Sequence, residues 1–241
     1  MHQPDTHFFL PKLSVGTHVL DPDESLHAIK VCRATPGDLL QLCDGLGHFA
    51  QGTVLEANPK ACTIQVPCVQ HSDQAPPRLH LALACLKDDA IEEVVFHCTQ
   101  LEIGSITLLR TEHSLEPRQS DLNRSLRRCR AKSLVSLKQC RKPWLTQILG
   151  PVYLNDWLTQ EAHGELIVCD PRGPVHAPHG WEQFESSTLL VGPEGGFSAT
   201  ELLLLEQWNG GSHTHWLGLG PTRLRAVTAP LYALGILSAH G

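Results

Sequence analysis

Gly192-Pro-Glu-Gly-Gly-Phe-Ser198 is the stretch of this 241-residue chain that decides its fold. It follows the apolar run Thr188-Leu-Leu-Val191 and precedes a helical pattern that begins at Ala199. A second glycine-rich loop, Gly218-Leu-Gly-Pro-Thr-Arg-Leu-Arg225, follows the apolar run His215-Trp-Leu217 in the same way. Two strand–loop–helix junctions this close in sequence predict two glycine loops at one end of a parallel sheet, where open α/β sheets bind ligands. The sequence therefore predicts a small-molecule pocket, built largely from backbone, near the C-terminus.

The glycine loops have two other interpretations. A single loop of this kind can be a tight turn in which glycine only permits a positive φ. A dinucleotide site is the second alternative, but Arg223 breaks the Gly-x-Gly-x-x-Gly spacing after Gly218, and no Gly-Lys-Ser/Thr phosphate loop is present. Dinucleotide loops also tend to lie at the first βα turn of a domain, whereas these loops lie at its end. The pattern therefore disfavours a phosphate-bearing dinucleotide.

The N-terminal part of the chain has the pattern of a small β-barrel. Asp44-Gly-Leu-Gly47 is a hairpin signal between two predicted strands, and Asp23 to Val31 is the one helical suggestion. Ser72 to Pro77 has the composition of a linker, so the predicted domains are residues 1–72 and 78–241. The predicted strands are Thr17–Leu20, Leu39–Cys43, Phe49–Leu55 and Cys62–Val66.

From Leu79 onward, strand and helix patterns alternate. Leu79 to Leu86 is a continuous apolar run, as in a buried parallel strand. Asp88 or Asp89 is placed to cap the next helix. Such alternation predicts an α/β layer fold with a mostly parallel sheet. The inner face of that helix is predicted to carry Ile91, Val94, Val95, Cys98 and Leu101. The further predicted strands are 105–109, 165–169, 188–191 and 215–217, and the further helices are 121–140, 199–208 and 226–239.

The charge of the chain is distributed unevenly. The formal net charge is −6, which argues against indiscriminate binding of nucleic acid. Between Arg118 and Lys142, however, basic residues are dense and Asp121 is the only acid. On a helix, Arg124, Arg128 and Lys132 share one face, with Leu122, Leu126 and Cys129 turned elsewhere. This asymmetry indicates a contact with a polyanion, although a solvated helix face is the alternative.

Cysteine and histidine usage gives no metal or disulfide framework. The nine cysteines are scattered without any Cys-x-x-Cys, which favours free thiols in a reducing cytosol. Among fifteen histidines, His213, His215, His176 and His179 are close in sequence, but carboxylate or cysteine companions at ligand spacing are missing. No signal peptide or membrane-spanning run is recognised. We therefore expect a cytoplasmic protein without a metal.

The first glycine loop, together with Leu219-Gly-Pro, Leu224-Arg225 and Thr228-Ala229, resembles the RsmE family. These are SPOUT-class methyltransferases that modify N3 of a uridine in small-subunit ribosomal RNA. The resemblance covers the whole chain, and the glycine loop is its most specific element. Its weaker elements lie in both predicted domains. In the N-terminal domain they are His27–Arg33, Gly37-Asp38 and Asp44–Gly47. In the C-terminal domain they are Leu86-Lys87, Thr111–Ser114, Lys138-Gln139, Arg141 and Pro143.

The resemblance implies a fold, a cofactor and partners. The fold is an N-terminal PUA-like β-barrel followed by a SPOUT-type α/β trefoil-knot domain. The cofactor is S-adenosylmethionine, the substrate is small-subunit (16S) rRNA, and the protein is a homodimer. Close backbone approach at glycines and apolar walls suit a bent adenosine cofactor. The implied cofactor-binding residues are Leu190, Val191, Gly192, Pro193, Gly195, Gly196, Leu217, Gly218, Leu219, Gly220, Leu224 and Thr228.

Arg225 and Glu194 are the candidate catalytic residues. Arg225 is a candidate for stabilising charge on a uracil oxygen, or else pairs with a carboxylate. Glu194 is either a base or a cap of the neighbouring helix, since carboxylates favour helix N-termini. The predicted RNA contacts are Arg124, Arg128, Lys132, Lys138 and Arg141, with Lys30 and Arg33 in the barrel.

The second loop departs from the family pattern. Gly-Pro is followed by Thr222 and Arg223, so the first arginine of the family pattern is either absent or shifted by one residue, and Val227 stands at a glutamate position. Gln100 and Cys140 replace a glutamate and a serine of the pattern. These changes favour an alternative, a diverged member that binds RNA with weak or no methyl transfer. A nucleotide-dependent oxidoreductase is disfavoured because its fingerprint is absent.

Overall fold

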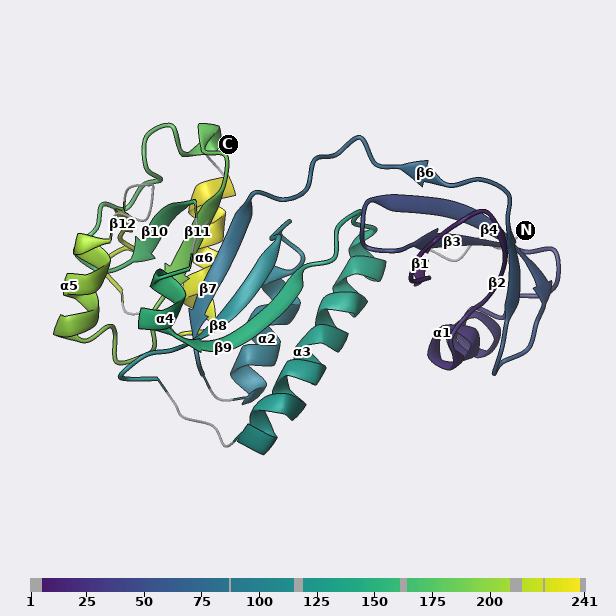
Figure 1. The fold of residues 1–241 in the computed structure, drawn as a ribbon, viewed down its shortest axis with the longest axis horizontal. Helices are drawn as coiled ribbons and strands as arrows, with labels where there is room; N and C mark the ends of the chain where they lie inside the picture. The colour runs from purple at the N-terminus through teal and green to yellow at the C-terminus, as the bar shows by residue number, and fades with distance from the viewer. Residues whose placement is uncertain are drawn as a thin grey trace. The chain divides into compact units, whose positions relative to one another are not determined.

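The computed structural model describes residues 6–86, 88–114, 119–160, 164–208, 214–222 and 224–238, without the side chains of 88 and 119–122 (Figure 1). The chain forms two compact units. The first comprises residues 1–76 and 134–145, and the second comprises residues 77–133 and 146–241. The short segment 134–145 thus joins the first unit, although its place in the sequence lies within the second predicted domain.

The first unit is built on a six-stranded sheet with the order β1–β3–β4–β5–β2, in which β6 also pairs with β4. Its core is formed by side chains such as Phe8, Leu40, Leu42 and Ile64, all with 0% exposure. The four predicted strands are present, whereas β1 and β6 were not predicted. The strands are β1 His7–Phe9, β2 Gly16–Val19, β3 Leu39–Cys43, β4 His48–Glu56, β5 Thr63–Val66 and β6 Gln70–His71.

The predicted helix of this unit is split in two. An α-helix, α1 (Pro22–Leu26), begins where the Asp21 side chain accepts a hydrogen bond from the Glu24 amide at 2.8 Å. A π-helical turn over residues 27–31 continues it. Glu24 is 3% exposed, and its carboxylate pairs with the ammonium of Lys138. This ion pair is one reason why the segment 134–145 belongs to the first unit.

The predicted hairpin at Asp44–Gly47 holds the same segment. The Gly47 amide donates to Pro143 O and the Leu145 amide donates to Gly45 O, both at 2.9 Å. Gly45 and Gly47 have φ values of 72° and 88°, which favour glycine. A Cβ at Gly47 would lie 2.7 Å from the Trp144 ring. The two glycines therefore serve both the turn and the close approach of residues 143–145.

The second unit has a six-stranded sheet with the order β12–β10–β11–β7–β8–β9, in which every pairing is parallel. This confirms the predicted α/β layer fold. All five residues of β11 are buried, as expected of a central parallel strand. The strands are β7 Leu79–Ala84, β8 Ser105–Arg110, β9 Gln147–Tyr153, β10 Glu165–Cys169, β11 Ser187–Val191 and β12 Thr214–Leu217.

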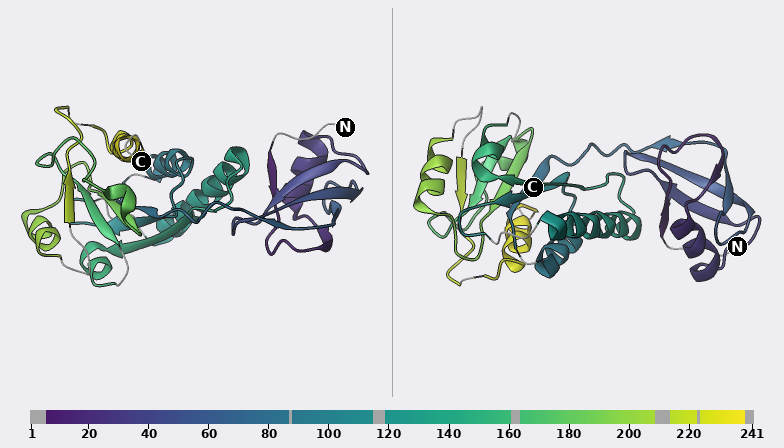
Figure 2. Two further views of the ribbon diagram at one scale, coloured as in Figure 1. Left: turned by 90° about the horizontal axis from the view of Figure 1, so that it is seen from above. Right: turned by 60° about the horizontal axis from the view of Figure 1, so that its bottom comes forward.

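Helices cover both faces of this sheet (Figure 2). Leu81 and Leu83 of β7 point into the core under α2 and α6, while Ala82 points into the core under α4 and α5. Strand side chains alternate between faces, so one apolar run supplies both layers. The helices are α2 Asp88–Cys98, α3 Gln119–Cys140, α4 Leu154–Leu158, α5 Ala199–Gln207 and α6 Thr228–Ser238.

The predicted inner face of α2 is correct except at its end. Ile91, Val94, Val95 and Cys98 are at most 1% exposed. Leu101 is 42% exposed, because α2 ends at Cys98 and Leu101 lies beyond it. In the part of the chain that the structure describes, no helix is both long and apolar enough to cross a membrane.

Candidate functional site

A cavity of about 470 Å³ lies where the three neighbouring strands β12, β10 and β11 end. Since these strands are parallel, their carboxyl ends share one edge of the sheet, which confirms that both glycine loops lie at the same end. The lining residues are Cys169–Pro171, Val191–Phe197, Leu219–Thr222, Leu224, Ala226 and Ala229.

Most of the predicted cofactor residues line this cavity, but four do not. Leu190 is buried in the core on the α4 and α5 side, because strand residues alternate and Val191 takes the opposite face. Leu217 is a core residue, Gly218 packs against Gly173, and Thr228 is the exposed first residue of α6. The predicted residues that line the cavity are Val191, Gly192, Pro193, Gly195, Gly196, Leu219, Gly220 and Leu224.

The end of β10 is a contribution that the sequence did not reveal. Cys169, Asp170 and Pro171 lie between the two glycine loops in strand order. The loop that follows β10 is rich in glycine and proline, but only the strand order shows that β10 separates β11 from β12. Burial raises the pKa of the Cys169 thiol to about 12, so it stays protonated near neutral pH although it borders the cavity. Cys169 is therefore not a thiolate nucleophile.

The first glycine loop is fixed at both ends by short contacts. The Gly196 amide donates to Pro193 O at 2.8 Å, and Gly196 has a φ of 74°. Ser198 is the N-cap of α5 and forms a capping box with Glu201. The interpretation of Glu194 as a cap of this helix is therefore wrong, because Ser198 occupies that place. Glu194 is exposed at the cavity instead.

The segment that follows β8 holds this loop from the side. His113 Nδ1 donates to Gly196 O at 3.0 Å, and the Glu112 amide donates to Glu201 Oε1 at 2.8 Å. The His113 side chain also borders Gly195, where an added Cβ would lie 3.2 Å from His113 Cβ and 3.5 Å from the ring atom Cγ. Only the family resemblance drew attention to residues 111–114, since no local pattern marks them as part of a site.

The second glycine loop crosses the loop after β10 at backbone contact. A Cβ on Gly218 would lie 2.2 Å from Gly173 O, and the Gly218 amide donates to Pro174 O at 2.8 Å. Only glycine permits this crossing. The trefoil knot implied by the resemblance stays a prediction.

Arg225 stands beside the cavity and does not line it. Its side chain is exposed, while its neighbours Leu224 and Ala226 are lining residues. Its carbonyl accepts hydrogen bonds from the Thr228 and Ala229 amides at 2.9 and 3.0 Å. The Arg225 backbone thus anchors the first turn of α6, and Arg223 lies outside the described residues.

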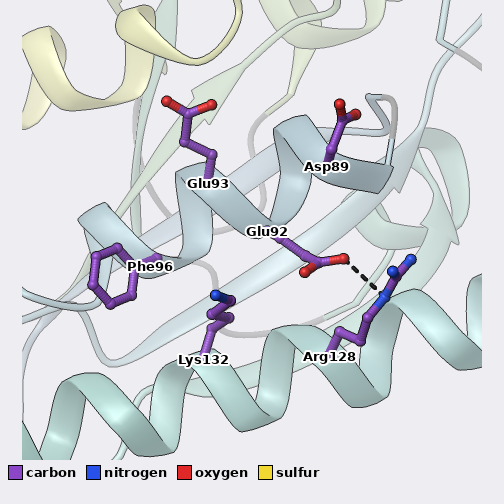
Figure 3. Close-up of a pocket in the computed structure, with 6 residues that line it drawn as sticks. All are labelled: Asp89, Glu92, Glu93, Phe96, Arg128 and Lys132. Carbon is purple, nitrogen blue, oxygen red and sulfur yellow. Dashed lines mark ion pairs between the residues drawn. The ribbon is translucent and has the colours of Figure 1, made fainter.

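The predicted basic face of α3 is partly occupied by α2 (Figure 3). Arg128 Nε lies 2.8 Å from Glu92 Oε1, and Lys132 Nζ lies 5.7 Å from the centre of the Phe96 ring. Glu92 points toward Arg128, whereas Asp89 and Glu93 project from the other side of α2. These contacts compete with binding of phosphate.

The other basic residues that were predicted to bind RNA differ in how far their side chains are exposed. Arg124 is exposed, whereas Leu126 and Cys129, predicted to turn away from the basic face, are buried. Lys138 requires a correction: its side chain is 15% exposed and its ammonium is paired with Glu24, so it supports the fold of the first unit. The predictions for Arg118 and Leu122 concern side chains that the structure does not describe. Arg33 and Arg141 are exposed in the first unit, with φ values of 58° and 53°.

Potential metal ligands do not gather in the described part of the chain. No group of three or more His, Cys, Asp or Glu side chains is placed there to hold a metal ion. The rings of His176 and His179 lie 5.9 Å apart, and His213 is not described. The nine cysteines are free thiols.

Comparison with protein families identifies the fold. An RNA methyltransferase domain matches residues 73–238, and an RNA methyltransferase PUA domain matches residues 20–67. The chain belongs to the RNA methyltransferase family. The predicted family and the predicted order of its two domains are thereby confirmed.

This RNA methyltransferase is similar to curated relatives named Ribosomal RNA small subunit methyltransferase E. The relative from Synechocystis is 27% identical over 220 residues, which cover 87% of this chain and 69% of the relative. That from Mycobacterium tuberculosis is 28% identical over 227 residues, which cover 90% and 84%.

Solved structures share the fold over nearly the whole chain. A methyltransferase from Legionella pneumophila, solved with bound S-adenosylmethionine, is 25% identical with a TM-score of 0.81, covering 98% of this chain and 97% of that one. A small-subunit methyltransferase E from Neisseria gonorrhoeae is 19% identical with a TM-score of 0.82 and the same coverage, which supports the fold.

Proposed function

We propose that this RNA methyltransferase transfers the methyl group of S-adenosylmethionine to N3 of a uridine in small-subunit rRNA. The observation that carries the proposal is the cavity between two glycine loops at the carboxyl edge of the sheet, in a chain of this family. The names of the curated relatives support the ribosomal substrate, and the Legionella structure supports the cofactor.

The lining of the cavity suits such a cofactor. Its volume, about 470 Å³, lies in the range of small-molecule sites. The described lining residues include no Lys, Arg or His that would bind phosphate, but they include the carboxylates of Asp170 and Glu194. Backbone groups of the glycine loops, apart from the Gly196 and Gly218 amides and the Gly196 carbonyl, which have partners, can meet an adenine edge. Leu219, Leu224 and Phe197 can pack on its faces. When bound, the cofactor supplies the methyl group on a cationic sulfur, which two carboxylates favour.

Two residues of the cavity rim have roles in this proposal. Uracil N3 carries a proton at neutral pH, so a proton acceptor or an electrostatic stabiliser of the anion is required. Glu194, exposed at the cavity, is the candidate acceptor. Arg225 stabilises the negative charge that develops on a uracil oxygen, because its side chain is exposed between two lining residues.

RNA binding is assigned to exposed basic residues of both units. Arg124 on α3, and Arg33 and Arg141 in the first unit, are exposed. Arg128 and Lys132 contribute less than the sequence predicted, since they have partners on α2. We also propose that the enzyme acts as a homodimer in the cytoplasm, on the strength of the family resemblance.

The test is methylation of small-subunit rRNA by the purified protein, read by mass spectrometry of nucleosides. The proposal requires N3-methyluridine to form only with S-adenosylmethionine present. Arg225→Ala should keep the cofactor affinity and strongly reduce transfer. Arg78→Ala, another exposed arginine of the second unit, is the matched control and should leave transfer unchanged.

The alternative, RNA binding without transfer, rests on Val227. This side chain is half-buried and packs against the core, at the position of the family's glutamate. Binding of rRNA and cofactor without any N3-methyluridine would support this alternative and refute the transferase proposal.

A further inference from the structure

Asp170 is the most enclosed carboxylate of the cavity. It follows β10, the strand between β11 and β12, so it lies between the two glycine loops in strand order. Its side chain is 11% exposed. Its backbone is anchored as well, because its amide donates to Leu217 O at 3.1 Å and its carbonyl accepts from the Gly173 amide at 3.0 Å.

One oxygen of this carboxylate is occupied. Oδ1 accepts from the Arg172 amide at 2.9 Å and from Arg172 Nε at 2.7 Å. Arg172 is itself held, since it pairs with Glu206 at 3.2 Å and lies over the Trp216 ring at 4.9 Å. The hydrogen bond from Arg172 to Asp170 raises the pKa of the guanidinium. The carboxylate is therefore fixed in orientation before any ligand binds.

The other oxygen, Oδ2, has no hydrogen-bond partner among the described residues. A carboxylate oxygen accepts hydrogen bonds and cannot donate them, so a bound ligand must present a donor to it. The adenine ring presents mostly acceptors on its edge, which the amides of the glycine loops can meet. Ribose hydroxyls are donors, and the ribose joins the adenine to the methionine part of S-adenosylmethionine, as Asp170 lies between the two glycine loops in strand order.

We infer that Asp170 Oδ2 accepts a hydrogen bond from a ribose hydroxyl of the nucleoside cofactor and makes the site selective for an adenosine with an intact ribose. The inference rests on the proposed function, because it concerns the same cavity. It assigns to Asp170 a role in affinity and specificity, independent of the residues that act on the uridine.

Calorimetry on the full chain tests this contact with three ligands. These are S-adenosylmethionine, methylthioadenosine, which lacks the amino acid, and the 2′,3′-dideoxy form of methylthioadenosine. Asp170→Asn keeps an acceptor for Arg172 and removes the charge. We expect the variant to bind the first two ligands about five- to twenty-fold more weakly, as for a lost charge-assisted hydrogen bond. The dideoxy ligand should bind the wild type and the variant equally.

The control is Asp156→Asn, the same change of side chain at an exposed aspartate of α4 that does not line the cavity. It should leave all three affinities within about two-fold, with circular dichroism verifying the fold of both variants. Equal weakening of the dideoxy ligand in Asp170→Asn would overturn the ribose contact. If Asp170→Asn weakens the binding of S-adenosylmethionine but not of methylthioadenosine, the ribose contact is overturned, and Asp170 binds the methionine amino group instead. If the wild type binds none of the ligands, the proposed function itself fails, whereas unchanged affinities in Asp170→Asn refute only this inference.

Discussion

Replacing Glu201 by alanine tests how the first glycine loop is held in place. Glu201 is 7% exposed in the first turn of α5. One carboxylate oxygen accepts from the Ser198 amide and the other from the Glu112 amide, both at 2.8 Å. The substitution therefore releases the end of the glycine loop and the segment after β8 at once.

The expected cost follows from the two amides that lose their acceptor. Ser198 is buried, and an unsatisfied buried amide costs about 1–3 kcal/mol. Glu112 is exposed, so water replaces part of its lost bond and the cost is about 1 kcal/mol. The free energy of unfolding should fall by about 2–4 kcal/mol, which corresponds to roughly 5–15 °C in Tm for a domain of this size. Alanine is the better helix former, so helix propensity does not add to the loss.

Urea denaturation measures the change in stability, and calorimetry with S-adenosylmethionine measures its consequence for the cavity. We expect affinity to fall several-fold, because the loop must be ordered again on binding. Glu206→Ala, on the exposed side of the same helix, is the control and should change stability by less than about 0.5 kcal/mol. Equal stability of the two variants would refute the role given to Glu201.

Three further substitutions address other contacts. Gly218→Ala places a Cβ 2.2 Å from the Gly173 carbonyl oxygen and should abolish stable folding. Its control, Gly235→Ala on α6, has open space around the added Cβ and should stabilise the protein by about 0.5–1 kcal/mol. Thermal denaturation compares the two variants, and similar Tm values would contradict the backbone contact between Gly218 and Gly173. Lys138→Ala leaves Glu24 buried without its partner and should cost about 3–5 kcal/mol in urea denaturation, much of which Glu24→Leu should restore. Arg124→Ala should lower the log–log salt slope of rRNA binding by about one, as measured by fluorescence anisotropy at several salt concentrations; an unchanged slope would exclude a phosphate contact there.

The parts of the fold that the sequence predicted are those with strong local signals. The run from Leu79 is apolar throughout, and its end is marked by charge, so β7 is recognisable. The two glycine loops follow apolar runs and precede helices, which places them at one edge. β9 was missed because Gly150-Pro151 lies within it and reads as a turn. Among the described strands it pairs with β8 alone, and such an edge strand tolerates proline.

The site was predicted less completely because it depends on contacts between distant segments. Asp170 enters the cavity through the position of β10 between β11 and β12, which no local pattern encodes. Glu92 of α2 precedes Arg128 of α3 by 36 residues in the sequence, yet the two side chains pair. Lys138 belongs to a basic run but is paired with Glu24, more than a hundred residues earlier. A count of charges along the chain cannot distinguish such pairs from a free basic surface.

The charges at the cavity have separate consequences for affinity and for rate. Asp170 and Glu194 favour a cationic sulfur when the cofactor binds, and that charge diminishes as the methyl group leaves. Interactions that weaken toward the transition state increase affinity without increasing the rate. The rate must therefore come from alignment, worth about 7–11 kcal/mol at best, and from stabilising the uracil anion. Arg225 is exposed and does not line the cavity, so in our proposal it acts on the uracil and not on the cofactor. It follows that changes at Asp170 should act mainly on the KM for cofactor, and changes at Arg225 mainly on kcat.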